Sequence, residues 1–117
     1  MLFVCYPKCS TCGKARAWLD AHNIEYTERD IKSEKPSRDE LAEWHKKSEL
    51  PLRRFFNTSG QLYRGMGLSS KLADMSEDEQ LDLLATDGML VKRPILVAGD
   101  KVLVGFREKD WEAALLG

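Results

Sequence analysis

The stretch that decides the fold runs from residue 2 to residue 19 and contains Leu2-Phe3-Val4-Cys5-Tyr6-Pro7-Lys8-Cys9-Ser10-Thr11-Cys12-Gly13-Lys14-Ala15-Arg16-Ala17-Trp18-Leu19. Its first part, residues 2–6, is apolar and β-prone and predicts a strand. Its last part predicts a helix that ends near Asn23, because side chains recur at helical spacing at Ala15, Trp18, Leu19 and His22. The pair Cys9 and Cys12 therefore lies where a strand passes into a helix N-terminus.

The placement of this Cys-x-x-Cys pair favours a thiolate at Cys9. Free backbone N–H groups and the positive end of the helix dipole stabilise an anion there, and the pKa of such a first thiol falls from about 8.5 toward 7 or below. Cys9 precedes the helix and is expected to face outward, whereas Cys12, one turn on, is expected to be more buried. Spacing and placement together are typical of a redox site of the thioredoxin type.

Length and composition limit the classes of protein that fit. The 117 residues predict a single domain, spanning 1–117, with its own hydrophobic core. Lys and Arg number 18 and Asp and Glu 19, so the net charge of −1 offers no electrostatic footprint for nucleic acid or an anionic membrane. The apolar runs are too short for a transmembrane helix, and the N-terminus has no secretory signal pattern. We therefore expect a cytoplasmic protein with no direct nucleic-acid or membrane partner.

The middle of the chain predicts one further strand and then a helical insertion. Residues 24–29 alternate apolar and polar side chains, which predicts a half-buried strand parallel to the first. Residues 37–88 predict the insertion, in which Pro51 suits the first position of a short helix and Gly88 a C-terminal cap. Two capping boxes mark helix starts within it, at Ser37-Arg38-Asp39-Glu40 and Ser76-Glu77-Asp78-Glu79.

The last third of the chain returns to β-structure. Residues 94–98 and 101–104 flank the dipeptide Gly99-Asp100, which is a strong hairpin signal. A closing helix follows from about residue 107. The order β-α-β, helices, β-β-α predicts an α/β fold with a four-stranded mixed sheet and helices on both faces.

A family resemblance is carried by three segments in this order: Tyr6-Pro7-Lys8-Cys9-Ser10-Thr11-Cys12-Gly13-Lys14-Ala15, Phe55-Phe56-Asn57-Thr58-Ser59-Gly60 and Asp87-Gly88-Met89-Leu90-Val91-Lys92-Arg93-Pro94. With them, the chain resembles the ArsC-like branch of the thioredoxin superfamily. This branch groups glutaredoxin-linked arsenate reductases with Spx and MgsR regulators and with relatives of the YffB and YusI types. The resemblance covers essentially the whole chain, is closest to the YusI type, and implies a thioredoxin-like fold.

The resemblance implies roles for individual residues. The position of Cys9 is the nucleophilic cysteine of the family, and Arg93, before Pro94, is one of the arginines that grip an oxyanion. A cis Arg93–Pro94 peptide bond is also implied. The candidate substrate- or anion-binding residues are thus Arg93, Pro94, Lys8 and Lys14, since basic groups near Cys9 would also lower its pKa.

Two positions depart from the pattern of the arsenate reductases. Asn57 stands near the place of a second arginine and Gly105 near that of a third, while Arg64 and Arg107 are out of register. One guanidinium cannot readily neutralise a multiply charged oxyanion. The sequence therefore predicts poor arsenate reduction.

Other uses of the cysteines and histidines are less consistent with their spacing. Zinc prefers four ligands, and besides the pair only Cys5, His22 and His45 remain, which are scattered; we predict no metal site. Cys5, on a core strand, is expected to behave as a small buried hydrophobe. The two histidines are expected to be structural.

The leading hypothesis is a thiol–disulfide oxidoreductase in which Cys9 attacks and Cys12 resolves through a redox-active disulfide. Its partners would be protein or small-molecule disulfides or oxidised thiols. No tightly bound cofactor is implied; an external thiol reductant such as glutathione, glutaredoxin or thioredoxin would regenerate the pair. The alternative is an Spx-like redox-sensing transcriptional regulator that binds the RNA polymerase α C-terminal domain, and a third is an arsenate reductase with an altered anion site.

Overall fold

The computed structural model describes residues 1–117 and contains one mixed sheet of four strands in the order β2-β1-β3-β4. These strands are β1 (Leu2–Cys5), β2 (Thr27–Asp30), β3 (Ile95–Ala98) and β4 (Lys101–Val104). β1 lies in the interior, parallel to β2 and antiparallel to β3, and β3 and β4 form an antiparallel hairpin. The predicted mixed four-stranded sheet is confirmed.

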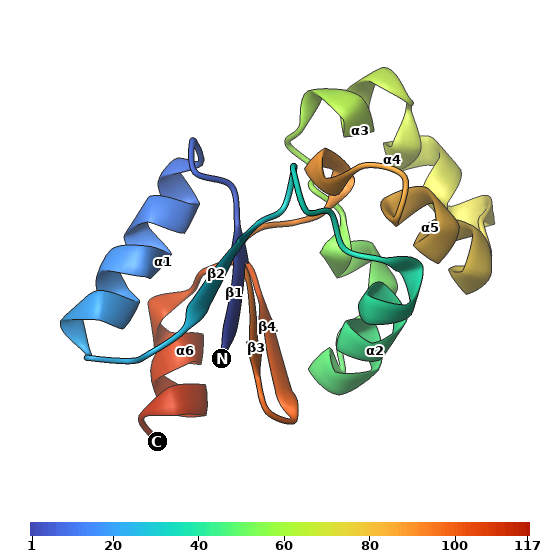
Figure 1. Cartoon of the computed structure of the whole chain (residues 1–117). Helices are drawn as coiled ribbons and strands as arrows, with labels where there is room; N and C mark the ends of the chain where they lie inside the picture. The colour runs from blue at the N-terminus through green and yellow to red at the C-terminus, as the bar shows by residue number, and fades with distance from the viewer.

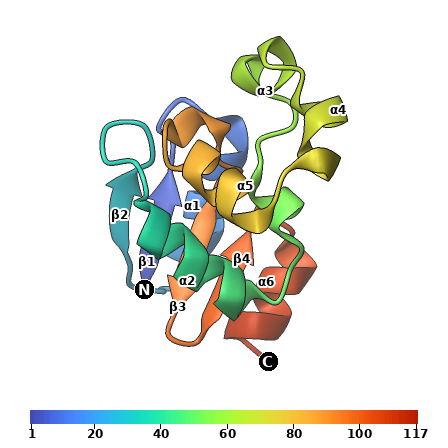
Figure 2. The ribbon, with the colours of Figure 1, turned by 90° about the vertical axis from the view of Figure 1, so that its right-hand side faces the viewer.

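Helices cover both faces of the sheet (Figure 1). One face carries α1 (Ser10–Ala21) and α6 (Glu108–Leu115), and the other carries α2 (Arg38–Ser48) and the helices that follow it. Figure 2, turned by 90°, shows α2 and α5 in front of the strands and α3 and α4 farther out at one end. None of these helices is long and apolar enough to cross a lipid bilayer.

The second strand, β2, begins later in the chain than predicted. α1 ends at Ala21 with His22 as its C-cap, and Asn23 adopts a left-handed backbone with φ of 56°. The strand expected over 24–29 forms only at Thr27–Asp30. Its start is set by the parallel register with β1, in which Leu2 pairs with Thr27, so residues 24–26 serve to bring the chain back to the sheet.

The segment from residue 38 to residue 90 is built from short helices. Between α2 and the sheet the chain forms η1 (Leu52–Phe55), α3 (Gln61–Gly65), α4 (Leu68–Lys71), η2 (Leu72–Asp74), α5 (Glu77–Leu84) and η3 (Gly88–Leu90). Both predicted capping boxes are present, at the starts of α2 and α5. Pro51 is the N-cap of η1 rather than its first residue. The only β-pairing here is an isolated bridge between Phe56 and Val91, so no strand from this segment joins the sheet.

Gly88 does not cap α5, and this prediction is wrong. The helix ends at Leu84 with Ala85 as its C-cap, while Gly88 begins η3. Gly88 is needed because its backbone packs directly against the carbonyl group of Ile31, where a Cβ atom would collide. This close approach joins the end of the helical segment to the loop after β2.

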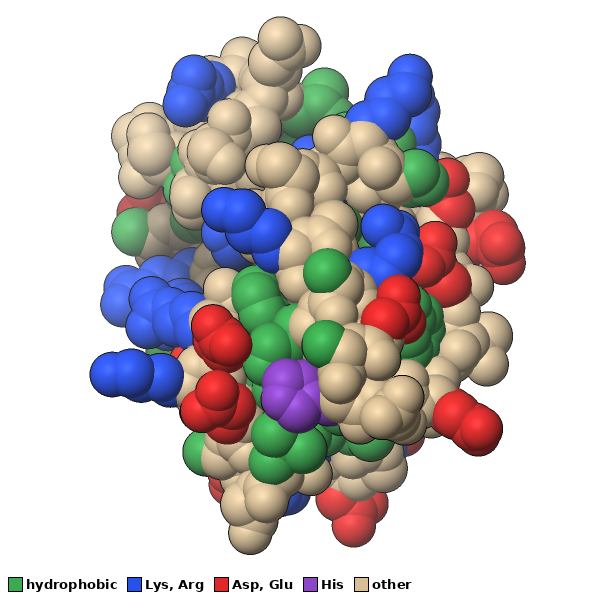
Figure 3. Space-filling view, turned by 90° about the vertical axis from the view of Figure 1, so that its left-hand side faces the viewer, with side chains coloured by type: hydrophobic (Ala, Val, Ile, Leu, Met, Phe, Trp, Pro, Cys, Tyr) green, Lys and Arg blue, Asp and Glu red, His purple; other side chains and the backbone are tan.

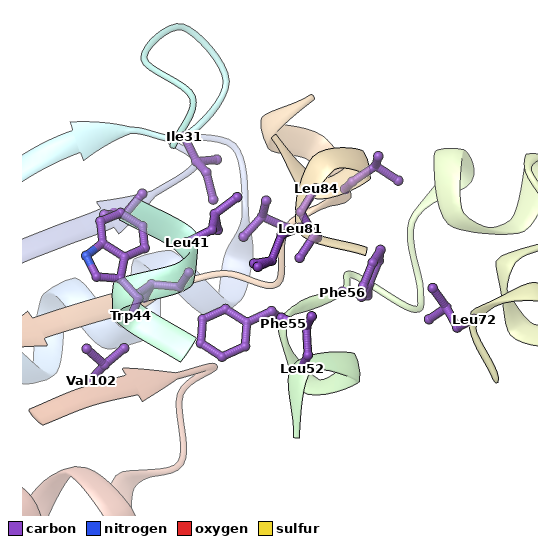
Figure 4. Close-up of a cluster of buried hydrophobic side chains, with 14 of the residues drawn as sticks. Ile31, Leu41, Trp44, Leu52, Phe55, Phe56, Leu72, Leu81, Leu84 and Val102 are labelled. Atoms are coloured by element: carbon purple, nitrogen blue, oxygen red, sulfur yellow. The ribbon is translucent and has the colours of Figure 1, made fainter. Parts of the chain in front are cut away.

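The core is divided by the sheet into two clusters. The larger one lies between the sheet, α2 and the helical segment, and Figure 4 shows its labelled side chains, among them Trp44, Phe55 and Val102, pointing toward one another. The smaller one lies between the sheet, α1 and α6, and consists of Phe3, Cys5, Cys12, Ala15, Trp18, Leu19, Leu96 and Trp111. Alternation along β1 explains the division, since Val4 faces the first cluster and Phe3 and Cys5 face the second.

Candidate redox-active site

The candidate site is formed by the loop that joins β1 to α1 and by the segment that enters β3. The loop closes through a hydrogen bond from the Cys9 N–H to the Tyr6 carbonyl, at 3.0 Å. Cys9 is the N-cap of the twelve-residue helix α1, so its side chain lies beside the free N–H groups of the first helical turn. Its carbonyl accepts the first helical bond, from the Gly13 N–H at 3.1 Å. The sulfur is therefore available for other contacts at a helix N-terminus.

The environment of Cys9 favours its thiolate. Partial burial raises the pKa of the Cys9 thiol, but hydrogen bonding from the Cys12 backbone N–H outweighs this effect together with further bonds. Those bonds come from the Cys12 and Arg93 side chains and from the Thr11 backbone N–H. The net result is a pKa below the ordinary value, and the half-buried sulfur remains accessible.

Cys12 has the opposite character. Its side chain is completely buried, and burial raises its pKa to about 12, with the nearby charge of Cys9 adding to the increase. The Tyr6 backbone N–H donates to the Cys12 sulfur at 3.4 Å, which only partly offsets the burial. Both thiols are free in this structure. The site thus pairs an activated, reachable thiol with a protonated, buried one.

Arg93 lies beside this pair, at the entry to β3. The Arg93–Pro94 peptide bond is cis, as expected, and Pro94 is buried. The Arg93 guanidinium carbon lies 5.2 Å from the centroid of the Tyr6 ring, a cation–π contact. Its Nε and Nη1 atoms are buried and have no hydrogen-bond partner. Buried donors of a charged group seldom remain unpaired, so these two unpaired atoms set Arg93 apart from the ion-paired arginines of the chain.

Lys8 and Lys14 lie on the surface, next to Cys9 in the sequence and in the second turn of α1. Both are exposed, and neither makes a hydrogen bond or an ion pair. Figure 3, which shows the face covered by α1 and α6, has basic and acidic side chains interspersed rather than gathered in one basic patch. The specific basic contact to Cys9 is that of Arg93.

The two positions that depart from the arsenate reductases have other tasks. Asn57 is 8 % exposed; its amide donates to the Met89 carbonyl at 3.5 Å, and its backbone N–H donates to the Leu90 carbonyl at 2.8 Å. Gly105 adopts φ of 74°, which favours glycine, and donates to the Pro94 carbonyl at 2.8 Å. Both residues therefore hold loops in place. The nearby arginines, Arg64 and Arg107, have exposed side chains.

The third cysteine, Cys5, is the last residue of β1. Cys5 is completely buried, and burial together with the charge of Glu28 raises its pKa to about 11. The Arg16 Nη2 atom lies 3.5 Å from its sulfur, and the same guanidinium forms two hydrogen bonds with Glu28, at 2.8 and 3.2 Å. Sequence reasoning missed Arg16, although the strand register gives the position of Glu28 beside β1.

The histidines contact neighbours in their own parts of the fold. The His22 Nδ1 atom lies 2.8 Å from the Trp18 carbonyl oxygen, and the His45 ring packs edge-on against Phe55. No group of three or more His, Cys, Asp or Glu side chains is arranged to hold a metal ion.

Tyr6 is another residue whose contact in the site sequence reasoning did not identify. The antiparallel register pairs Val4 with Ile95, and continuing it by two residues brings Tyr6 opposite Arg93. This register, once known, would have identified the contact. A groove of about 860 Å³ lies elsewhere, between α2 and the helices that follow, and none of the cysteines lines it.

The ArsC family model matches residues 5–114. This chain belongs to the ArsC family. It is 53 % identical over 112 residues to the uncharacterized protein YusI of Bacillus subtilis, covering 96 % of this chain and 95 % of YusI. It is 33 % identical over 106 residues to the regulatory protein MgsR of the same species, covering 91 % of this chain and 82 % of MgsR. Among solved structures, an ArsC family related protein from Bacteroides fragilis superimposes with a TM-score of 0.94 at 54 % identity, covering 96 % of this chain and 94 % of that chain.

Proposed function

We propose that this ArsC-family protein is a thiol–disulfide oxidoreductase in which Cys9 is the nucleophile and Cys12 the resolving thiol. The observation that carries the proposal is the contrast between the two cysteines. Cys9 is reachable and has a lowered pKa, whereas Cys12, one helical turn away, is completely buried and has a pKa of about 12. A dithiol reductase requires this difference in pKa and accessibility between its two thiols, because only the thiolate attacks a disulfide.

The reaction would proceed in two exchange steps. The Cys9 thiolate attacks one sulfur of a substrate disulfide, a Cys9–substrate bond forms, and the other substrate sulfur leaves as a thiolate. Cys12 then gives its proton to the first departing substrate thiolate and attacks the Cys9 sulfur, which forms the Cys9–Cys12 disulfide and releases the second substrate sulfur as a thiolate that takes its proton from water. The substrate gains two electrons and the protein loses two. An external thiol, such as glutathione, glutaredoxin or thioredoxin, would return them.

The surroundings of Cys12 suit the second step. While Cys9 is ionised, its charge raises the pKa of Cys12. This repulsion disappears once Cys9 is bound in a mixed disulfide, while the hydrogen bond from the Tyr6 N–H to the Cys12 sulfur remains to stabilise a thiolate. Cys12 would therefore become a better nucleophile when it is needed.

A trapping experiment tests this proposal. Reduced protein is mixed with oxidised glutathione and analysed by mass spectrometry without reductant. Cys12→Ser is expected to accumulate a glutathione adduct at Cys9, the unchanged chain to pass on to a Cys9–Cys12 disulfide, and Cys9→Ser to form neither. Cys5→Ala is the matched control and should behave like the unchanged chain. An adduct mainly at Cys12, or no Cys9–Cys12 disulfide, would refute the assigned roles.

A second candidate function is a redox-sensing regulator, favoured by the 33 % identity to the regulatory protein MgsR. In this case the Cys9–Cys12 disulfide would change a binding surface instead of processing a substrate. The partner that the resemblance to Spx suggests is the RNA polymerase α C-terminal domain. Binding of that domain by the reduced and oxidised protein, measured by calorimetry, separates the two candidates: a redox-dependent affinity supports the regulator.

Arsenate reduction is the third candidate, and we expect it to be negligible beside disulfide reduction. Asn57 and Gly105 are engaged in holding loops, so Arg93 is the one arginine at the anion position. Steady-state assays with both substrates decide the order. Robust arsenate turnover that Arg93→Ala abolishes would place this candidate first.

A further inference from the structure

Tyr6 contacts each of the three groups that form the redox site. Its carbonyl accepts a hydrogen bond from the Cys9 N–H at 3.0 Å, and its N–H donates to the Cys12 sulfur at 3.4 Å. Its ring lies under the Arg93 guanidinium at 5.2 Å. The two backbone contacts fix the loop, whereas the ring contact is the one that depends on the identity of the side chain.

The Arg93 side chain needs such a contact to stay in place. Its Nε and Nη1 atoms have no hydrogen-bond partner, so its contact with the Cys9 sulfur does not by itself hold the planar group in a fixed orientation. The face of an aromatic ring attracts a guanidinium and sets the plane in which it lies, most strongly where water is excluded. Here the ring is that of Tyr6, which directly follows β1 and begins the cysteine loop.

We propose that Tyr6 is a positioning residue whose ring holds the Arg93 guanidinium beside the Cys9 sulfur. Tyr6 does not itself touch the reacting atoms through its ring; it acts through Arg93. Its significance for turnover rests on the function proposed above. Its effect on the ionisation of Cys9 does not, because that is a property of the resting protein.

The ring and not the hydroxyl carries this role. The Tyr6 hydroxyl has no hydrogen-bond partner in the structure, and the ring is half-buried against the larger core cluster. Tyr6→Phe keeps the aromatic face and removes only the hydroxyl, so it is the matched control. Tyr6→Leu removes the aromatic face while keeping an apolar side chain.

The experiment measures the rate at which iodoacetamide modifies Cys9 between pH 5 and pH 9. Iodoacetamide is uncharged, so its approach does not depend on Arg93. We expect Tyr6→Leu to move the midpoint upward by about half a pH unit, a roughly threefold loss of rate on the acidic side, and Tyr6→Phe to leave it unchanged. An unchanged midpoint in Tyr6→Leu would overturn the proposal.

A double-mutant cycle excludes a merely structural effect. Arg93→Gln alone should raise the midpoint, and adding Tyr6→Leu to Arg93→Gln should shift it no further, because the ring then has no guanidinium to hold. An equal additional shift in the double variant would show that Tyr6 acts independently of Arg93 and would refute the proposal. If circular dichroism shows Tyr6→Leu to be unfolded, Tyr6→Met, with a longer apolar side chain and no ring, takes its place with the same outcomes.

The same samples distinguish this inference from the proposed function. Glutathione disulfide turnover is measured beside the alkylation midpoints. If the unchanged chain forms no Cys9–Cys12 disulfide, the oxidoreductase proposal fails, and the midpoints still decide the role of Tyr6. If turnover is present and the midpoints of all variants coincide, only the role of Tyr6 is refuted.

Discussion

The contrast in acidity between Cys9 and Cys12 predicts which cysteine an alkylating reagent modifies first. The pKa of Cys9 lies below the ordinary 9.0, so at least about 1 % of Cys9 is thiolate at pH 7. A pKa of about 12 means that roughly one part in 100,000 of Cys12 is thiolate at the same pH. The thiolate fractions thus differ about 1,000-fold. A thiolate of lower pKa is intrinsically a weaker nucleophile, which reduces this advantage by a factor of about 15 to 30. Cys9 should therefore react at least about 30-fold faster, and the complete burial of Cys12 adds to the difference.

The assay follows iodoacetamide modification of the reduced protein by peptide mass spectrometry across a range of pH. Cys9→Ser should remove the fast phase, and Cys12→Ser should retain it. Denatured protein serves as the control, because unfolding should bring both cysteines to the same pH profile. Suppose that iodoacetamide modifies the two cysteines of the folded protein at similar rates, and that the pH midpoints of both rates are near those of ordinary thiols. The helix N-terminus and Arg93 then do not activate Cys9. The proposed mechanism would then have lost its physical basis.

Three further outcomes are expected. Gly88→Ala should lower the free energy of unfolding by about 2–3 kcal/mol in urea titrations, because the new methyl group meets the Ile31 carbonyl; an unchanged midpoint would contradict the close approach. Glu40, whose pKa the Arg29 guanidinium lowers to about 2, contributes stability that is present above its unfolded pKa of about 4.3 and is lost as the pH falls toward 2. Glu40→Gln should therefore cost about 1 kcal/mol at pH 7, since the pair is partly exposed, and should lose less stability than the unchanged chain between pH 4.5 and pH 2. Cys5→Ala should leave the rate of Cys9–Cys12 disulfide formation within about twofold of the unchanged chain, and a larger loss would give Cys5 a part in the exchange.

Features set by neighbouring residues could be predicted from the sequence. The capping boxes at Ser37 and Ser76 form as expected, because each needs only four consecutive residues. The hairpin turn at Gly99 is also local, and Gly99 has the positive φ, 60°, that its turn requires. The position of Cys9 at a helix N-terminus follows from the same kind of signal.

Features that depend on distant parts of the chain could not be predicted in this way. α3 and α4 are too short to show a helical period. α4 is held by the burial of Leu68, whereas α3 has no buried side chain. The sequence around Gly88 indicates a helix cap, because the residue that Gly88 packs against, Ile31, is far away in sequence. The contact between Tyr6 and Arg93 escaped notice for the same reason, although both residues belong to segments that the family resemblance singles out.

The interior place of β1 in the sheet has a consequence for the order in which the site comes into being during synthesis. Residues 2–4 leave the ribosome early, but their antiparallel partners, residues 95–97, are made only after the whole helical segment. Such non-local pairing is slow to form and leaves an open strand edge in the nascent chain. Arg93 emerges with the same late segment, so through most of translation Cys9 has no guanidinium beside it and Cys12 has an incomplete core around it. The contribution of Arg93 to the acidity of Cys9 is therefore acquired only as the sheet closes, after the contribution of the first turn of α1.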